Sequence, residues 1–287
     1  MMSQKTDERF DFQHCLTCGS VFLQKPVNKN CINKYYPSWY LPFRGADAWG
    51  KYSFLVKAAE NAQDKKRVKR CLKYFDKNQN INVLDIGCGK PSFLAQLDKR
   101  TNWKLTGLDF KINNWNEDKK YSNIDLIDGE LENKSFDRKF DLITMWHYLE
   151  HDYHPDETMA RIEKLLNPGG IVIIEVPNYK SLTQKWQKEH WEGWHTPRHT
   201  VLYHPDSWST LFNNAGIHLH KHDQYGTLDP FLLYWMGIME KKNIDWSKNM
   251  ESEFPGLVIR KILTSPLFAL SRFIPLGIQT AIGKKPI

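Results

Sequence analysis

The stretch Val83-Leu84-Asp85-Ile86-Gly87-Cys88-Gly89 decides the fold class of this chain. Its apolar part predicts a short strand over residues 81–86, and its glycines let the backbone turn tightly and approach a ligand. A helix is expected next, over residues 91–97. Asp109 then closes the following predicted strand, residues 104–108, where a carboxylate can accept the two hydroxyl protons of a ribose. The segment therefore indicates a nucleoside-binding α/β domain.

Strands and helices continue to alternate after this segment. Apolar runs predict strands over 124–127, 140–145 and 170–176, with a helix over 157–166 between the last two. A further strand is expected over 217–224. Such alternation favours a parallel sheet with crossover helices. We expect an N-terminal extension (1–46), a central domain (47–225) and an apolar C-terminal segment (226–287).

The acidic residue at the end of the first strand distinguishes between cofactors. Asp85 lies two positions before Gly87, where it would repel a pyrophosphate but attract an ammonium or a sulfonium group. The third position of the glycine pattern is Pro91, and no phosphate-binding Lys-Ser/Thr pair follows. S-adenosylmethionine is therefore the expected cofactor. A nicotinamide-dependent oxidoreductase is the alternative.

Several motifs in this order resemble the class I S-adenosylmethionine-dependent methyltransferases. They are VLDIGCG (83–89), LTGLD (105–109), GEL (129–131), FDLIT (140–144), LEH (149–151), LLNPGG (165–170) and EVPN (175–178). The resemblance implies a Rossmann-like sheet of seven strands, mostly parallel with the last antiparallel, with helices on both faces. The cofactor-binding residues expected on this resemblance are Asp85, Gly87, Cys88, Gly89, Asp109, Glu130, Leu131 and Trp146. Pro91 departs from the usual glycine, which predicts an altered loop shape.

Histidines after the fourth strand are candidates for a general base. A hydroxyl acceptor benefits from a base that titrates near neutrality, and histidine does so. The candidates are His151 of LEH, together with His195 and His199 of a loop that resembles the His-x-Pro-Arg-His element of a bacterial branch acting on glycans and small molecules. In that loop Trp194 would stack on the acceptor and Arg198 would bind a carboxylate or phosphate. A tryptophan-rich loop that only packs against the sheet is the alternative.

Metal binding is not expected. The run His147-Tyr148-Leu149-Glu150-His151 matches a short zinc-protease pattern, but it follows a strand of a nucleoside-binding fold, which disfavours zinc hydrolysis. Three alternating histidines in 217–224 fit an exposed edge strand better than a metal site. Cys15 and Cys18 resemble half of a zinc ribbon, and the other pair is missing.

The two flanking segments differ in character. The N-terminal extension is aromatic and interrupted by prolines, so long regular elements are not expected there. Two C-terminal stretches, 228–239 and 257–282, are apolar and flanked by basic residues such as Arg260 and Arg272. They suit helices lying on a membrane surface. The alternatives are a helical cover over the site, or a strand returning to the sheet near 277–283.

Composition fixes the broad class of this protein. The 287 residues are 41% hydrophobic and 25% charged, which excludes intrinsic disorder, and five cysteines favour a reducing compartment. No basic segment followed by an apolar core opens the chain, so we expect a cytoplasmic protein. The net charge of +7 is spread along the chain without a nucleic-acid-reading motif, so no nucleic-acid partner is expected.

These observations predict a methyltransferase that uses S-adenosylmethionine to methylate a hydroxyl group of a small molecule or glycan. A cofactor-binding protein without catalysis, in peripheral contact with a membrane, is the alternative from another class.

Overall fold

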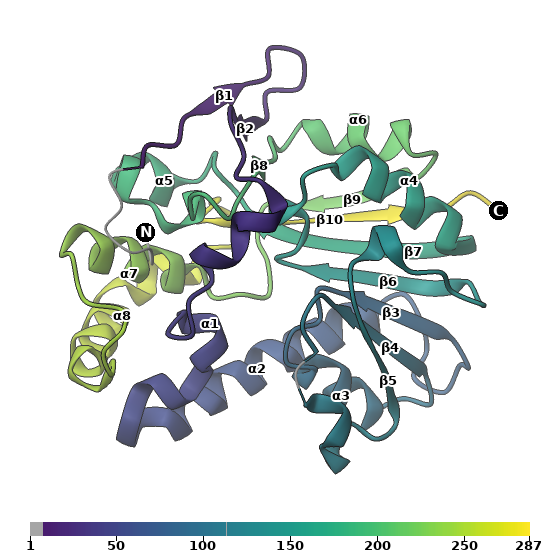
Figure 1. Cartoon of the computed structure of the whole chain (residues 1–287), viewed down its shortest axis with the longest axis horizontal. Helices are drawn as coiled ribbons and strands as arrows, with labels where there is room; N and C mark the ends of the chain where they lie inside the picture. Colours follow the sequence, from purple (N-terminus) through teal and green to yellow (C-terminus); the bar gives the residue numbers. More distant parts are fainter. Residues whose placement is uncertain (1–7, 113) are drawn as a thin grey trace.

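A computed structural model of the chain describes residues 8–112 and 114–287, which are organised around one seven-stranded sheet (Figure 1). The strands, in spatial order, are β5 (Ile124–Asp128), β4 (Lys104–Asp109), β3 (Asn82–Ile86), β6 (Phe140–Trp146), β7 (Leu166–Pro177), β10 (Ile278–Lys284) and β9 (His218–Asp223). The first five run parallel to one another, as the alternation of elements predicts. The expected Rossmann-like sheet is confirmed.

The antiparallel strand comes from the C-terminal segment. β10 pairs antiparallel with β7 on one side and with β9 on the other. Of the alternatives for this segment, a strand returning near residues 277–283 is therefore correct. We expected the central domain to end at residue 225, but β10, which belongs to its sheet, lies in the C-terminal segment.

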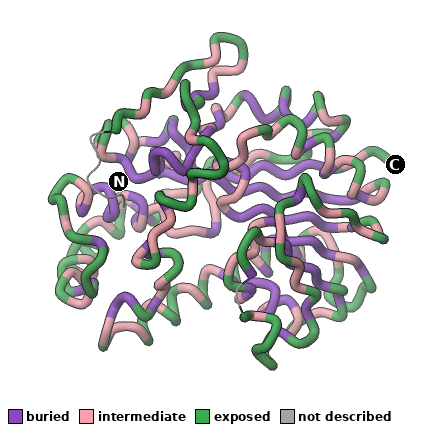
Figure 2. Tube along the Cα trace, in the orientation of Figure 1, coloured by how far each residue is buried: buried purple, intermediate pink, exposed green. Residues whose placement is uncertain are grey.

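Helices cover both faces of the sheet, and each face has its own hydrophobic core. Helices α4 (Pro155–Leu165) and α6 (Ser207–Asn214) contribute Met159, Trp208 and other buried side chains to one core. On the other face, α2 (Ser53–Cys71) and α3 (Ser92–Asp98) pack Val68 and Phe93 against the strands. Most residues of the central strands β3, β6 and β7 are buried (Figure 2). This burial explains their almost purely apolar sequences.

The N-terminal extension consists of short elements, as expected. A small sheet joins β1 (Phe12–His14) and β2 (Val21–Leu23) to β8 (Val201–Leu202). The 3₁₀ helix η1 (Lys29–Tyr35), the single turn α1 (Leu41–Arg44) and η2 (Gly45–Tyr52) follow. The sheet pairing ties the extension to the loop that precedes α6.

The C-terminal insertion lies between β9 and β10 and is mainly helical. It contains α7 (Pro230–Lys241), η9 (Glu251–Glu253) and α8 (Phe254–Ala269). Its buried side chains share a third core with Tyr40 of the extension and with Trp49 of η2. The extension and the insertion therefore pack together beside the sheet (Figure 1). Among the described residues, no helix combines the length and the apolar character needed to cross a bilayer.

The remaining helices are short and lie in connections. They are η3 (Trp115–Glu117), η4 (Lys119–Tyr121), η5 (Leu131–Asn133), η6 (Leu149–His151), α5 (Leu182–Gln187), η7 (Lys188–His190) and η8 (Glu192–Trp194). Of these, η6 follows β6, and η8 leads into the loop with the His-x-Pro-Arg-His element.

Candidate active site

The glycine loop after β3 lies at the carboxyl edge of the sheet. Gly87 N donates to Leu108 O over 2.8 Å, which ties the loop to the end of β4. Gly87 and Gly89 have φ angles of 71° and 51°. A Cβ on Gly87 would lie 2.6 Å from Cδ2 of Tyr148, whereas one on Gly89 would meet no atom within 4 Å. Gly87 is therefore required by its conformation and by crowding, and Gly89 leaves space beside the loop.

Asp109 is held against this loop by backbone hydrogen bonds. Its carboxylate accepts from Gly89 N at 2.8 Å and from Lys111 N at 3.0 Å. Burial raises the pKa of Asp109, although these two bonds favour the charged form. Carboxylate oxygens have further lone pairs, so Asp109 can still accept ribose hydroxyl protons. The structure thus brings together the loop and the acidic residue that the sequence paired.

Asp85 lies at the carboxyl end of β3 and is buried. Its Oδ1 accepts a hydrogen bond from Thr144 Oγ1 at 2.6 Å. Burial raises the pKa of Asp85 to about 7, because its desolvation outweighs the hydrogen bond from Thr144. A positively charged ligand group beside Asp85 would favour its ionised form.

The other expected cofactor residues have varied surroundings. Glu130 has a half-exposed side chain 3.6 Å from the ammonium of Lys29. The side chain of Leu131 is buried in the hydrophobic core, and its carbonyl accepts a hydrogen bond from Lys134 N at 3.3 Å. Cys88 is partly buried, and burial raises the pKa of its thiol. Trp146 is buried, and its indole nitrogen has no hydrogen-bond partner within residues 8–112 and 114–287.

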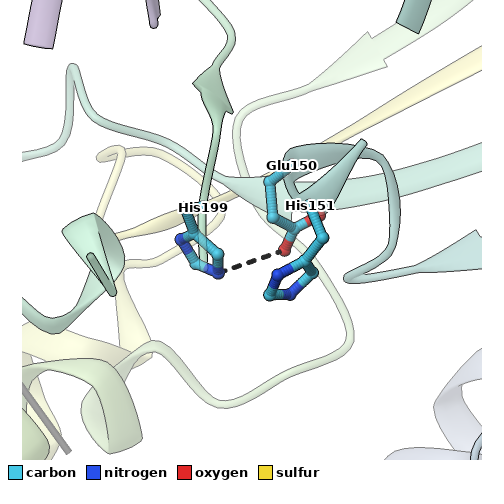
Figure 3. A group of neighbouring side chains, drawn as sticks. All are labelled: Glu150, His151 and His199. Atoms are coloured by element: carbon cyan, nitrogen blue, oxygen red, sulfur yellow. Dashed lines mark ion pairs between the residues drawn. The ribbon is translucent and has the colours of Figure 1, made fainter. Parts of the chain in front are cut away.

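Two histidines from separate elements meet near the end of β6 (Figure 3). Nδ1 of His151 lies 3.1 Å from Arg198 O, and Nδ1 of His199 lies 2.8 Å from Gly193 O. A carbonyl only accepts, so each Nδ1 carries the hydrogen and each neutral ring keeps a lone pair on Nε2. Burial lowers the pKa of both rings, which keeps them neutral at pH 7.

Glu150 completes this cluster. Its Oε1 lies 4.0 Å from Nε2 of His199, and one donor atom from each of Glu150, His151 and His199 lies within 4.8 Å of the others. Of the described residues, this is the group that could hold a metal ion. This group differs from the zinc-protease pattern of the sequence, because it contains His199 in place of His147.

His147 has another role. It adopts a left-handed backbone conformation with a φ of 59° and lies outside η6, so residues 147–151 do not form the continuous helix that a zinc-protease motif needs. Its ring lies 3.2 Å from Glu150 and 3.4 Å from Glu175. Burial lowers the pKa of His147, but the two carboxylates outweigh that effect and raise it to about 9. His147 is therefore a charged partner for two buried acids.

His195 is fully engaged. Its Nδ1 contacts the Glu192 carboxyl group, and its Nε2 lies 2.8 Å from the hydroxyl of Tyr40. Burial, together with the charge of Arg198, lowers the pKa of His195 well below its usual value. Since both ring nitrogens have partners, His195 is less suited than His151 to take a proton from an acceptor.

Arg198 is a buried cation that forms no ion pair within the described part of the chain. Its side chain is 1% exposed, and Nη1 donates to Tyr35 O at 2.6 Å. Its guanidinium lies 4.7 Å from the ring centre of Tyr40. Nε and Nη2 have no hydrogen-bond partner among the described residues. They are the groups with which arginine binds a carboxylate or phosphate.

Trp194 and two tyrosines of the N-terminal extension have contacts that the sequence did not indicate. The Trp194 indole donates to Lys188 O and packs against Phe12, with ring centres 5.0 Å apart. Such packing matches the alternative of a structural tryptophan. Sequence reasoning assigned no site role to Tyr36 and Tyr40, which approach His151 and His195. The sequence feature that could have indicated these two residues is their position in an aromatic extension.

The strand order, the glycine loop and the carboxylate closing β4 define a class I S-adenosylmethionine-dependent methyltransferase. The chain belongs to the methyltransferase-domain family, whose sequence profile matches residues 58–222, more than half of its length. S-adenosylmethionine is therefore its cofactor.

Curated relatives share the central part of the chain. It is 25% identical over 116 residues to a mitochondrial ubiquinone biosynthesis O-methyltransferase of Dictyostelium discoideum, covering 35% of this chain and 36% of the relative. It is 27% identical over 120 residues to a ubiquinone biosynthesis O-methyltransferase of Hydrogenovibrio crunogenus, covering 38% and 49%. The matches thus span less than half of each relative.

Solved structures share the fold. A putative methyltransferase in complex with the Trm112 activator of Haloferax volcanii has a TM-score of 0.54 and 18% identity, covering 80% of this chain and 96% of that one. A putative sarcosine dimethylglycine methyltransferase of Galdieria sulphuraria has a TM-score of 0.55 and 12% identity, covering 80% and 88%. At these identities the likeness concerns the fold alone.

Proposed function

We propose that this protein transfers the methyl group of S-adenosylmethionine to a hydroxyl group, with His151 as the general base. One observation carries the proposal. The Nδ1 hydrogen of His151 is directed at Arg198 O, which leaves Nε2 as a proton acceptor near the end of β6. The lowered pKa keeps this ring neutral and therefore able to accept a proton at pH 7.

The proposed reaction is an in-line displacement. The acceptor oxygen attacks the methyl carbon while Nε2 of His151 takes the hydroxyl proton. The carbon–sulfur bond breaks and its electron pair stays on sulfur, which yields S-adenosylhomocysteine and a methyl ether. The protonated His151 then loses its proton to water. The protein contributes chiefly by holding the acceptor oxygen about 3 Å from the methyl carbon.

The acceptor we propose is a small molecule or a glycan unit that carries an acidic group. The buried guanidinium of Arg198 has two nitrogens without a hydrogen-bond partner among the described residues, and the backbone carbonyl of Arg198 accepts from Nδ1 of His151. An acceptor carboxylate or phosphate on Arg198 would therefore place a neighbouring hydroxyl near His151. The O-methyltransferase names of the two curated relatives support oxygen as the acceptor atom.

Exchange of His151 for alanine tests the base. His151→Ala should lower kcat by about 10²–10⁴ and leave the Kd of S-adenosylhomocysteine unchanged. His154→Ala is the matched control, because His154 is exposed on the same segment. Acceptors are found by incubating labelled methyl donor with fractions of a cell extract, separated into acidic and neutral pools. Unchanged turnover of His151→Ala would refute the assignment of the base.

Two alternatives predict other results in the same assays. A nicotinamide oxidoreductase would bind NAD(H) in calorimetry, and the buried carboxyl group of Asp85 at the glycine loop argues against a pyrophosphate there. A protein that only binds the cofactor would retain S-adenosylhomocysteine affinity but transfer no label to any fraction.

We also propose the cytoplasm as the location of this protein. All five cysteines are free thiols, which is the state expected in a reducing compartment. Fractionation of cells that produce the protein tests this proposal, since recovery from an oxidising compartment would contradict it.

A further inference from the structure

Helix α8 is apolar on two sides, but only one side is buried. Phe254, Leu257 and Phe268 pack into the core shared by the N-terminal extension and the C-terminal insertion. Ile259, Ile262 and Leu263 lie on another side of the helix and are 58%, 66% and 74% exposed. A helix that is hydrophobic all round is normally covered on all sides. The described segments of the chain leave this side of α8 uncovered.

The exposed apolar surface continues past the end of the helix. Leu270 and Phe273 follow in the next turns, with exposed fractions of 44% and 84%. We call the set Ile259, Ile262, Leu263, Leu270 and Phe273 the α8 stripe. Isolated exposed apolar residues are normal on a protein surface, but a row along one helix marks a contact site.

The charged residues around the α8 stripe indicate which kind of partner it fits. Arg260 and Arg272 are exposed and flank the stripe, and Lys261 lies beside them in an ion pair with Asp229. From Phe254 to Ile287 the sequence contains no aspartate or glutamate. The stripe therefore lies in a positively charged surrounding, and a negatively charged partner complements it.

We propose that the α8 stripe is a docking surface for a bilayer that contains anionic phospholipids. The apolar side chains enter the boundary between headgroups and acyl chains, and Arg260 and Arg272 contact the phosphates. A second copy of the chain fits less well, because a two-fold contact through this stripe would bring the same basic residues of both copies together.

The position of the stripe gives the contact a role. The insertion that carries α8 shares its core with Tyr40, and Tyr40 bonds to His195 in the candidate active site. Docking would thus hold the acceptor side of the enzyme at a membrane. This surface goes beyond the proposed methyl transfer and does not depend on it, because vesicle binding is measured without turnover.

The first test is flotation of the full chain with vesicles. Binding is expected to vesicles of 30% phosphatidylglycerol in phosphatidylcholine and to be much weaker with phosphatidylcholine alone. Leu263→Gln with Phe273→Gln should weaken binding at least about tenfold, because two apolar side chains no longer enter the bilayer. Leu16→Gln with Ile287→Gln is the matched control, since both side chains are almost fully exposed elsewhere.

The second test separates charge from apolar contact. Arg260→Gln with Arg272→Gln should weaken binding to the anionic vesicles about 30-fold, at about fivefold for each cation, and leave binding to neutral vesicles unchanged. Calorimetry with S-adenosylhomocysteine shows that each variant is folded. Absence of wild-type binding to the anionic vesicles would overturn the proposal. So would a wild-type dimer in light scattering that the Leu263 and Phe273 double variant dissociates.

Discussion

Replacing Asp85 by asparagine should stabilise the protein and impair its cofactor site at the same time. The carboxyl group is buried and its pKa is raised to about 7, so its ionised form is costly in the cofactor-free protein. A pKa raised from 3.8 to about 7 corresponds to about 2–4 kcal/mol at pH 8. Asparagine removes that cost and can still accept the hydrogen bond from Thr144.

The pH dependence has a definite sign. The protonated carboxyl group is favoured by folding, so its contribution is complete below pH 4 and is lost as the pH rises through about 7. The free energy of unfolding of Asp85→Asn should therefore exceed that of the wild type by about 2–4 kcal/mol at pH 8. The gain at pH 5 should be less than half of that. Urea unfolding of the cofactor-free proteins at both values measures it.

Cofactor binding should change in the opposite direction. The ammonium of S-adenosylhomocysteine favours an ionised Asp85, whose pKa in the free protein is about 7, so the wild-type Kd should rise about fivefold between pH 7 and pH 6. Asp85→Asn should weaken binding about 30-fold at pH 8 and remove this slope. Methylthioadenosine, which lacks the ammonium, is the control ligand and should bind both proteins equally. A variant no more stable than wild type at pH 8, or one with unchanged S-adenosylhomocysteine affinity, would refute the reasoning.

Three further perturbations test other parts of the structure. Zn²⁺ should inhibit methyl transfer by occupying Glu150, His151 and His199, and His199→Ala should relieve the inhibition. EDTA should leave turnover unchanged, and a loss that Zn²⁺ restores would contradict a free base at His151. Gly87→Ala should weaken S-adenosylhomocysteine binding at least tenfold in calorimetry, because of the crowding by Tyr148 and a strain of about 1–3 kcal/mol, whereas Gly256→Ala should be neutral. Ile174→Ala should cost about 2–5 kcal/mol in urea unfolding, because this fully buried side chain lies in the sheet core, and a cost below 1 kcal/mol would contradict that packing.

Local sequence patterns predicted the parallel part of the sheet well. A buried parallel strand is a continuous apolar run, and its period and length are visible without tertiary information. Such runs predicted strands over residues 81–86 and 140–145, and the observed strands, Asn82–Ile86 and Phe140–Trp146, differ from them by one residue each. The glycine loop was predictable because the turn after a strand needs glycine at a positive φ. Asp109 was predictable because it directly follows the next apolar run.

The acceptor side of the site could not be read from the sequence in the same way. His151 contacts both Tyr36 and His199, which come from distant segments, and no local pattern indicates that the three meet. Which nitrogen of His151 is free depends on the carbonyl of Arg198, a contact between residues 47 positions apart. The same limit applies to Trp194, which packs structurally against Phe12.

The sequence by itself determined the strand–loop–helix unit around residues 83–89, the alternation that makes the sheet parallel, and the carboxylates that suit a cationic nucleoside cofactor, because each follows from local conformational preference. Only the tertiary structure decided that residues 278–284 insert between β7 and β9. It also decided that, within residues 8–112 and 114–287, Arg198 is buried without an acidic partner and one side of α8 is left uncovered. The physical reason is that pairing, burial and charge compensation depend on which distant segments come into contact, and these contacts leave no periodic signal in the chain.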